Sequence, residues 1–533
     1  MSTLTRLVSP ASWLGRTTIL ACIILLPFVG FLAGDGYPLL TPEALAGIAL
    51  LWIVCACLAF CFRGLAFRGI FIVAVCVIAA VPLQREASRW AAIPLAVTIV
   101  ALASVSAGLM ALLHGRFYQV LATFSLGMLA AHLAPILLPA GAPRMAPEKP
   151  AHVLRLILDE HMGPAGLPPE IAACRHAADT IRTTFGNAGF ELFPYAYSNY
   201  ATTLDSVPSL LNRVLLPHRH ALLQQPAPDL RGVFHANTSK FLDEYRARGL
   251  AVRLVQYRNI DFSNGRGALV TQYPGSLAHL ARAPGSWIDR FRLVIGHYQA
   301  SNAVLARFRG FFPFRCGLRM VLPISAEAIW PDGLITEITA AAKPTLFLAH
   351  ILSPHGPYVY RPDGSLRDIR VWARDEDYER LNRQDYEERY TRYAEQVEYV
   401  QSQLGRLFDE LRRAGLLDQM CVVVHGDHGS RILLQRPGLK PTRVHGPAGV
   451  DRYDYDTAPD PQDLRDRFSV LLAIKLPGRQ AATINSDKGS AQRFLSERLY
   501  GQEIVRPSPV DSAFLFDAQG KPREIRMGNL WDH

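Results

Sequence analysis

Long apolar runs are concentrated in roughly the first 140 residues of the chain. The runs cover approximately Thr17–Ala33, Ala44–Phe62, Ile70–Leu83, Ala91–Leu113 and Phe117–Leu138. Charges are nearly absent inside them, and most are long enough to cross a bilayer as a helix. A cleavable signal peptide would explain the first run but not the four that follow. The pattern predicts an N-terminal transmembrane domain of about five helices over residues 1–138.

The short loops between these runs set the orientation. Arginines precede the first run and lie in the loops after the second and fourth: Arg6, Arg16, Arg63, Arg68 and Arg116. Basic loops stay in the cytoplasm, so the N-terminus is expected inside and the chain beyond about residue 140 outside. Arg85 and Arg89 do not fit this scheme.

The hydrophobic pattern changes after a Pro- and Ala-rich linker at residues 139–152. Short apolar runs typical of buried strands cover Val153–Leu158, Ala251–Val255, Thr345–Leu348 and Cys421–Val424. They alternate with helical patterns over Ser206–Leu215, Thr238–Arg248 and Asp385–Ala414. Alternating strands and helices predict an α/β domain over residues 153–533, with a mostly parallel sheet between helices.

Composition adds two limits to this picture. The formal net charge is +10, but no dense basic tract occurs, so we do not expect nucleic acid as a partner. A mildly basic domain beside a bilayer fits anionic lipid head groups better. Outside the apolar runs only Cys174, Cys316 and Cys421 occur, in no metal-binding spacing; a Cys174–Cys316 bridge is possible, since pairing cannot be derived from sequence.

The first candidate chemistry follows the run Val422–Val424, where Asp427 and His428 stand between glycines. Carboxylate and imidazole at the carboxyl end of a strand are ligands for a divalent metal, at the edge where open α/β sheets keep their sites. The alternative is a turn that carries these residues by coincidence. Asp159 and Glu160 follow another predicted strand in the same way, which favours a shared metal site over surface charges.

Hydroxyl side chains cluster at the start of a predicted helix, at Thr202, Thr203 and Ser206. A helix N-terminus stabilises an alkoxide or a bound phosphate, so a threonine near a metal could be a nucleophile. The alternative is that these hydroxyls only cap the helix, with Ser206 as N-cap. His355 and His445 each precede Gly-Pro in polar loops, where they could bind phosphate or transfer protons, or could be surface residues.

Together these motifs resemble the membrane-anchored branch of the alkaline phosphatase–sulfatase superfamily. The likeness is greatest to phosphoethanolamine transferases and looser to phosphoglycerol transferases and lipoteichoic acid synthases, which have about five N-terminal spans and an extracytoplasmic domain. The resemblance places the nucleophile at Thr203, in Thr203-Leu-Asp-Ser206-Val-Pro208. It implies metal ligands from the residues Asp159, Glu160, Thr203, Asp427 and His428. His355 and His445 match its phosphate-binding and proton-transferring histidines.

Some residues depart from that pattern. Gly426 replaces the usual serine before Asp-His-Gly, and an additional histidine, His425, precedes it. The cysteines that many phosphoethanolamine transferases carry around the nucleophile are missing. Sulfatases need Cys-x-Pro-x-Arg, or Ser in place of Cys; the segment from Ser206 to Leu210 lacks the arginine, which disfavours sulfate-ester hydrolysis.

The resemblance implies a metal-dependent transferase of a bacterial inner membrane, multi-pass, with its catalytic domain on the periplasmic side. The expected ion is Zn²⁺, with Mn²⁺ or Mg²⁺ as alternatives. A membrane phospholipid would donate its head group through a phosphothreonine intermediate, and an envelope glycan or lipid would accept it. A membrane-anchored phosphodiesterase or sulfatase-like hydrolase and a non-catalytic lipid sensor of the same fold remain open.

Overall fold

The computed structural model of the chain separates into two compact units, Met1–Ala142 with Ser276–Leu318 and Pro143–Gly275 with Arg319–His533. The residues that it describes are 17, 25, 28–32, 37–61, 152–218, 221–224, 234–236, 239–257, 260–263, 268–273, 280–301, 330–371, 383–435, 442–445, 451–454, 460–500, 512–516, 521–528 and 530–531. The predicted boundaries at residues 138 and 152 remain predictions.

The first unit contains helices α3 (Pro42–Cys61) and α10 (Trp287–Ser301). Helix α3 coincides with the second predicted apolar run. The buried carboxylate of Glu43 accepts hydrogen bonds from the hydroxyl of Tyr37, at 2.5 Å, and from Nε of Arg290, at 3.1 Å. The other four predicted runs lie wholly or mostly outside the described residues. Within the described part of the chain, no helix combines the length and the apolar character needed to cross a membrane.

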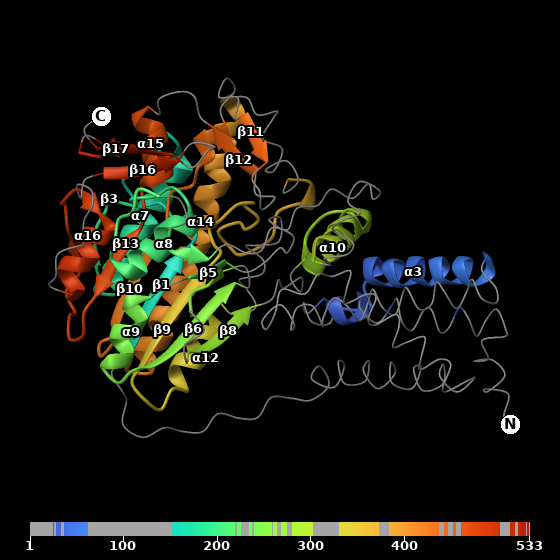
Figure 1. The fold of residues 1–533 in the computed structure, drawn as a ribbon, viewed down its shortest axis with the longest axis horizontal. Coiled ribbons are helices and arrows are strands. Elements are labelled where there is room, and N and C mark those ends of the chain that lie inside the picture. Colours follow the sequence, from blue (N-terminus) through green and yellow to red (C-terminus); the bar gives the residue numbers. More distant parts are fainter. Residues whose placement is uncertain are drawn as a thin grey trace. The chain divides into compact units, whose positions relative to one another are not determined.

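The second unit is built on an eight-stranded sheet (Figure 1). In spatial order its strands are β14 (Thr483–Ile484), β2 (Glu191–Leu192), β13 (Leu472–Lys475), β10 (Cys421–Gly426), β1 (Val153–Leu158), β9 (Thr345–Ile351), β6 (Ala251–Tyr257) and β8 (Leu269–Tyr273). All neighbours from β10 to β8 are parallel, whereas β13 runs antiparallel to both of its neighbours. The predicted α/β class and the mostly parallel sheet are confirmed.

Helices cover both faces of this sheet, because side chains alternate between the faces along each strand. On one face, Leu154 and Leu156 join an apolar cluster with α7 (Ala172–Asn187), α12 (Asp332–Thr339) and α14 (Arg383–Arg413). On the other face, Ile157 packs with α8 (Thr203–Asn212) and α9 (Lys240–Ala247), and Val423 packs with α16 (Ala491–Leu495).

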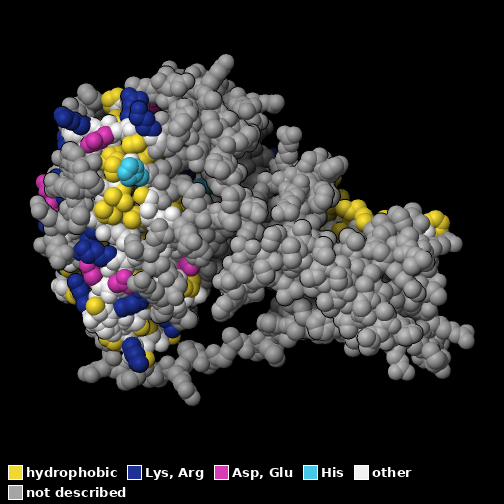
Figure 2. Space-filling view, viewed as in Figure 1, with side chains coloured by type: hydrophobic (Ala, Val, Ile, Leu, Met, Phe, Trp, Pro, Cys, Tyr) yellow, Lys and Arg dark blue, Asp and Glu magenta, His cyan; other side chains and the backbone are white. Residues whose placement is uncertain are grey.

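The remaining elements are short. They are β3 (Ala196–Tyr197), β4 (Leu223–Gln224), β5 (Phe234–Ala236), β7 (Ile260–Asp261), η2 (Leu280–Arg282), η5 (Ile432–Gln435), β11 (Thr442–His445), β12 (Asp451–Asp454), α15 (Pro461–Phe468), β15 (Gly489–Ser490), η6 (Ser496–Tyr500), β16 (Ser512–Phe516) and β17 (Pro522–Arg526). On the face drawn in Figure 2, basic and acidic side chains of the described residues are interspersed with apolar ones.

Most predicted elements form within a few residues of their expected bounds, but the start of one helix differs. Helix α8 begins at Thr203 rather than Ser206, because the carbonyl of Thr202 already accepts the N–H groups of Asp205 and Ser206. Pro208 therefore lies inside the helix and not in its first turn. Strand β13 follows α15, a helix that begins at a capping box and ends at Phe468.

Candidate metal centre and nucleophile

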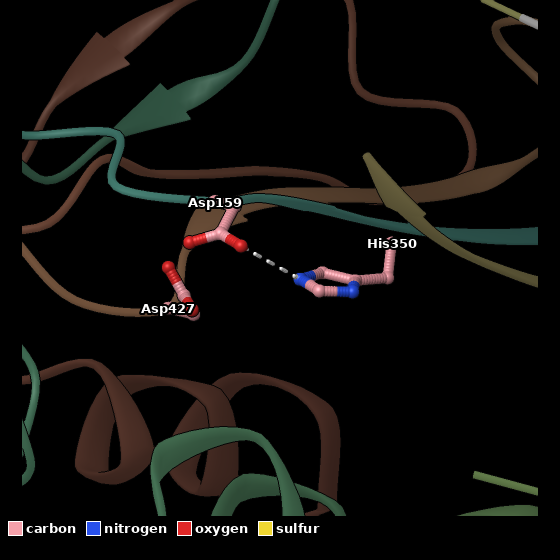
Figure 3. Close-up of side chains that lie close together, drawn as sticks. All are labelled: Asp159, His350 and Asp427. Atoms are coloured by element: carbon pink, nitrogen blue, oxygen red, sulfur yellow. Dashed lines mark ion pairs between the residues drawn. The ribbon is translucent and has the colours of Figure 1, made fainter. Parts of the chain in front are cut away.

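Three neighbouring parallel strands bring the first polar cluster together. Asp159 follows β1 and Asp427 follows β10, while His350 is the penultimate residue of β9, and parallel strands present their carboxyl ends at one edge. One possible ligand atom from each residue lies within 4.8 Å of the others (Figure 3). All three side chains are buried. The predicted Asp159 and Asp427 therefore meet, joined by a histidine that was not predicted to be part of the site.

The donor atoms of this cluster fit a divalent cation. Oδ1 of Asp159 and Oδ2 of Asp427 are buried and have no hydrogen-bond donor among the described residues. Burial of such an oxygen without a partner is costly, and a cation between the carboxylates would remove that cost. Burial and the nearby charges of Asp427 and Glu160 raise the pKa of Asp159 well above its usual value. Two carboxylates and an imidazole suit Zn²⁺ or Mn²⁺.

His428 adds a second imidazole to the same group. Its Nδ1 lies 2.8 Å from the carbonyl oxygen of Gly429, which makes Nδ1 the donor and leaves a lone pair on Nε2. That Nε2 lies 3.4 Å from Oδ2 of Asp427 and 3.7 Å from Oδ1 of Asp159. Burial lowers the pKa of His428, which keeps the ring neutral and able to bind a metal.

The carboxylate of Asp427 is fixed by the backbone. Its Oδ1 accepts the N–H groups of Glu160, at 2.9 Å, and of His428, at 2.8 Å. Burial would raise the pKa of Asp427, but the imidazoles of His428 and His350 outweigh it and lower the pKa. Asp427 is thus held as a carboxylate with its second oxygen turned toward the cluster.

Thr203, the predicted nucleophile, is the first residue of α8. Its hydroxyl oxygen lies 3.2 Å from Nε2 of His428. The N-cap is the neighbouring Thr202, whose hydroxyl donates to Asp205 at 2.7 Å and makes no capping bond to the helix backbone. Because Thr203 does not cap the helix, its hydroxyl is available at a helix N-terminus, beside the candidate ligands.

Glu160 points to a different set of partners from those of Asp159. It has a left-handed backbone, with φ of 61°, and its carboxylate accepts the N–H of Gly356 at 3.2 Å and pairs with the guanidinium of Arg431. Nε2 of His355 lies 3.5 Å from the same carboxylate. Burial would raise the pKa of Glu160, but His355 and Arg431 lower it to about 2. The carboxylate is therefore ionised and already neutralised by protein groups.

Helix α14 holds the segment around His355, residues 354–360, in place. Nε2 of Gln396 donates to the carbonyls of Pro354, at 3.0 Å, and His355, at 3.1 Å, while its Oε1 accepts N–H groups from Val359 and Tyr360. The hydroxyl of Tyr393, one turn earlier, donates to the carbonyl of Glu160 at 2.7 Å. Tyr393 belongs to the apolar core on this helix, whereas Gln396 is a buried polar residue beside it.

Two further histidines have defined places. His445 ends β11, and its side chain lies outside the described residues. His425 is buried in β10, and its Nε2 accepts a hydrogen bond from Nε of Arg155 at 3.1 Å. Burial lowers the pKa of His425 to about 3, so the additional histidine is a neutral partner of a buried arginine. Cys174 is a buried free thiol in α7, and Cys316 lies outside the described residues.

The comparison with protein families gives one match. Residues 320–460 match the sulfatase family model, a stretch that contains β9, α14 and β10 and with them His350, Asp427 and His428. This stretch of the chain is therefore similar to the sulfatase family, which confirms the predicted resemblance to the alkaline phosphatase–sulfatase superfamily. No curated protein shows significant sequence similarity to the chain.

Several solved structures are similar to the chain. The C-terminal periplasmic domain of EcEptC from Escherichia coli has 13% identity over 72% of this chain and 96% of its own, with a TM-score of 0.39. The same domain in complex with Zn has 12% identity, 73% and 97% coverage, and a TM-score of 0.38. A phosphonate monoester hydrolase of Agrobacterium radiobacter has 13% identity, 69% and 82% coverage, and a TM-score of 0.38.

Proposed function

We propose that the protein is a metal-dependent transferase that moves a phospholipid head group, of the phosphoethanolamine or phosphoglycerol type, to an envelope glycan or lipid. The position of Thr203 is the observation that supports this most strongly. Its hydroxyl lies at a helix N-terminus, 3.2 Å from Nε2 of His428 and next to two buried carboxylates. A hydroxyl in this setting is suited to nucleophilic attack on phosphorus.

In the proposed reaction, Oγ1 of Thr203 forms a bond to phosphorus while the bond to the diacylglycerol oxygen breaks. Diacylglycerol leaves with a proton, and the head group stays on the threonine as a phosphodiester. An acceptor hydroxyl then attacks the same phosphorus, gives up its proton and restores Thr203. The free N–H groups of α8 stabilise the negative oxygens in both steps.

The other residues are assigned to holding and orienting groups. Asp159, His350, Asp427 and His428 would hold the metal ion, most consistent with Zn²⁺, beside the hydroxyl of Thr203. When bound, the ion would lower the pKa of the threonine hydroxyl and neutralise charge on the phosphoryl group. His355, together with His445, is proposed to bind phosphate oxygens and transfer protons.

A lipid donor requires a site at a membrane. We propose that the five apolar runs anchor the chain in a bacterial inner membrane, with the catalytic unit on the periplasmic side. Helix α3 forms where the second run was predicted, and several of its large apolar side chains are exposed, including Leu45, Trp52 and Ile53.

A hydrolase is the second candidate, because the sulfatase family match covers β9 and β10. The two are separated by giving the full chain, purified in detergent, a head-group-labelled phospholipid with and without a hydroxyl-bearing glycolipid acceptor. A transferase labels the acceptor, and it releases free head group only when the acceptor is left out. Equal release of free head group in both reactions would instead support the phosphodiesterase. No turnover with either would favour the lipid sensor.

A further inference from the structure

Arg431 is a cation built into the edge of the candidate metal centre. It has a left-handed backbone, with φ of 59°, three residues after His428. Its Nε donates to Oε1 of Glu160 at 3.2 Å, and its Nη2 pairs with the same oxygen. The side chain of Arg431 is 29% exposed, whereas that of Glu160 is 6% exposed. The guanidinium is thus fixed to a buried carboxylate, while part of the arginine side chain stays exposed.

The pairing of Arg431 with Glu160 balances one of the buried negative charges of the site. Asp159, Glu160 and Asp427 are three buried acids, and the guanidinium of Arg431 neutralises one of them. Each of the other two acids, Asp159 and Asp427, has one buried oxygen without a donor among the described residues, and one divalent ion between them would satisfy both. A second ion at Glu160 would have to displace Arg431 as well as the N–H of Gly356.

The geometry of the guanidinium leaves donors for a ligand. An arginine has five N–H donors in a rigid plane, and Glu160 uses those of Nε and one of Nη2. Nη1 and the second hydrogen of Nη2 make no hydrogen bond to the residues that the structure describes. A planar guanidinium binds phosphate oxygens with paired hydrogen bonds, which a lysine cannot reproduce.

We propose that Arg431 is the second cation of this site. It neutralises the carboxylate of Glu160 in place of a second metal ion, and it binds the anionic oxygens of the group that Thr203 attacks. The site then holds one ion per chain and selects substrates with a negatively charged phosphoryl group. The part concerning the attacked group rests on the proposed function, while the metal count and the anion binding do not.

The test uses the full chain in detergent, in the background Thr203→Ala, so that binding is measured without turnover. Chains loaded with Zn²⁺ and freed of excess metal are analysed for zinc content, and binding of inorganic phosphate is measured by calorimetry. We expect one zinc per chain. Arg431→Gln should weaken phosphate binding roughly 10- to 100-fold, as loss of charge-assisted hydrogen bonds does, and Arg431→Lys should restore only part of it.

Controls separate the proposal from misfolding. Arg431→Gln should keep its first zinc, which shows that the cluster of Asp159, His350 and Asp427 is intact. Arg370→Gln removes an exposed arginine of the same unit, paired with Asp368, and should leave both readouts unchanged. Two zinc ions in the parent protein, or equal phosphate affinity with and without Arg431, would overturn the proposal. Activity in a Thr203→Ala enzyme would overturn the proposed function but not the role of Arg431.

Discussion

The hydroxyl of Thr203 and the imidazole of His428 lie 3.2 Å apart although 225 positions separate them in the chain. The sheet places His428 just beyond β10, and α8 packs on the face of that sheet with its first residue at the carboxyl edge. The candidate nucleophile and the candidate metal ligands therefore come from two separate parts of the fold.

Removal of a candidate ligand should release the metal. Asp427→Asn or His350→Ala should weaken zinc binding by more than about 100-fold, since even the loss of a residue that only orients a ligand costs about 10- to 100-fold. Zinc analysis after dialysis measures this. His425→Gln is the matched control, because it changes a buried histidine of β10 that pairs with Arg155. Retention of full zinc by His350→Ala would remove His350 from the ligand set.

Gln396 should be required to hold the segment around His355 in its observed conformation. Gln396→Leu preserves the size of the side chain but leaves the buried N–H groups of Val359 and Tyr360 without an acceptor. We expect a loss of about 2–3 kcal/mol in the free energy of unfolding and reduced turnover. Denaturant unfolding and activity assays measure the two effects. Gln403→Leu, on the same helix, should cost less than about 0.5 kcal/mol.

Glu191 should contribute stability that depends on pH. Burial would raise its pKa, but hydrogen bonds from Arg498, Asn485 and Arg479 lower it below the usual 4.5. A lowered pKa stabilises the fold above that usual value, and this contribution is lost as the pH falls through the folded-state pKa. Glu191→Gln should cost about 1 kcal/mol at neutral pH and less in acid. An equal loss in thermal unfolding at about pH 7 and about pH 3.5 would contradict this assignment.

The predicted topology is tested by reporter fusions. If the N-terminus is cytoplasmic and the chain crosses the membrane five times, an alkaline phosphatase reporter placed after residue 150 should be active. The same reporter placed between Arg63 and Arg68 should be silent. The opposite pattern of activity would reverse the orientation and exclude an extracytoplasmic catalytic unit.

The sequence was most informative where an apolar strand stops at a charge. The bounds of β1 were predicted without error, and the acids after β1 and β10 were recognised because two predicted strands end in the same way, at residues able to bind a metal. His350 was not recognised because it lies inside the apolar run of β9, where a single histidine resembles an ordinary buried residue. Only the register of β9 against β1 brings it to Asp159.

The partners of Glu160 could not be predicted for a different reason. Arg431 is separated from it by 271 positions, and both residues have left-handed backbones that L-amino acids seldom adopt. Their meeting depends on the exact paths of two loops. Helix starts are similarly uncertain: Pro208 favoured a start at Ser206, whereas the carbonyl of Thr202 begins the helix three residues earlier.

The central claim is that Thr203 carries the head group during transfer. The most direct measurement is the intact mass of the full chain after brief incubation with Zn²⁺ and a phospholipid donor, with the adduct mapped by digestion. We predict an added head-group mass on the peptide containing Thr203, its absence in Thr203→Ala together with a loss of activity of several orders of magnitude, and its retention in Thr202→Ala. An active Thr203→Ala enzyme, or an adduct on another residue, would contradict the account.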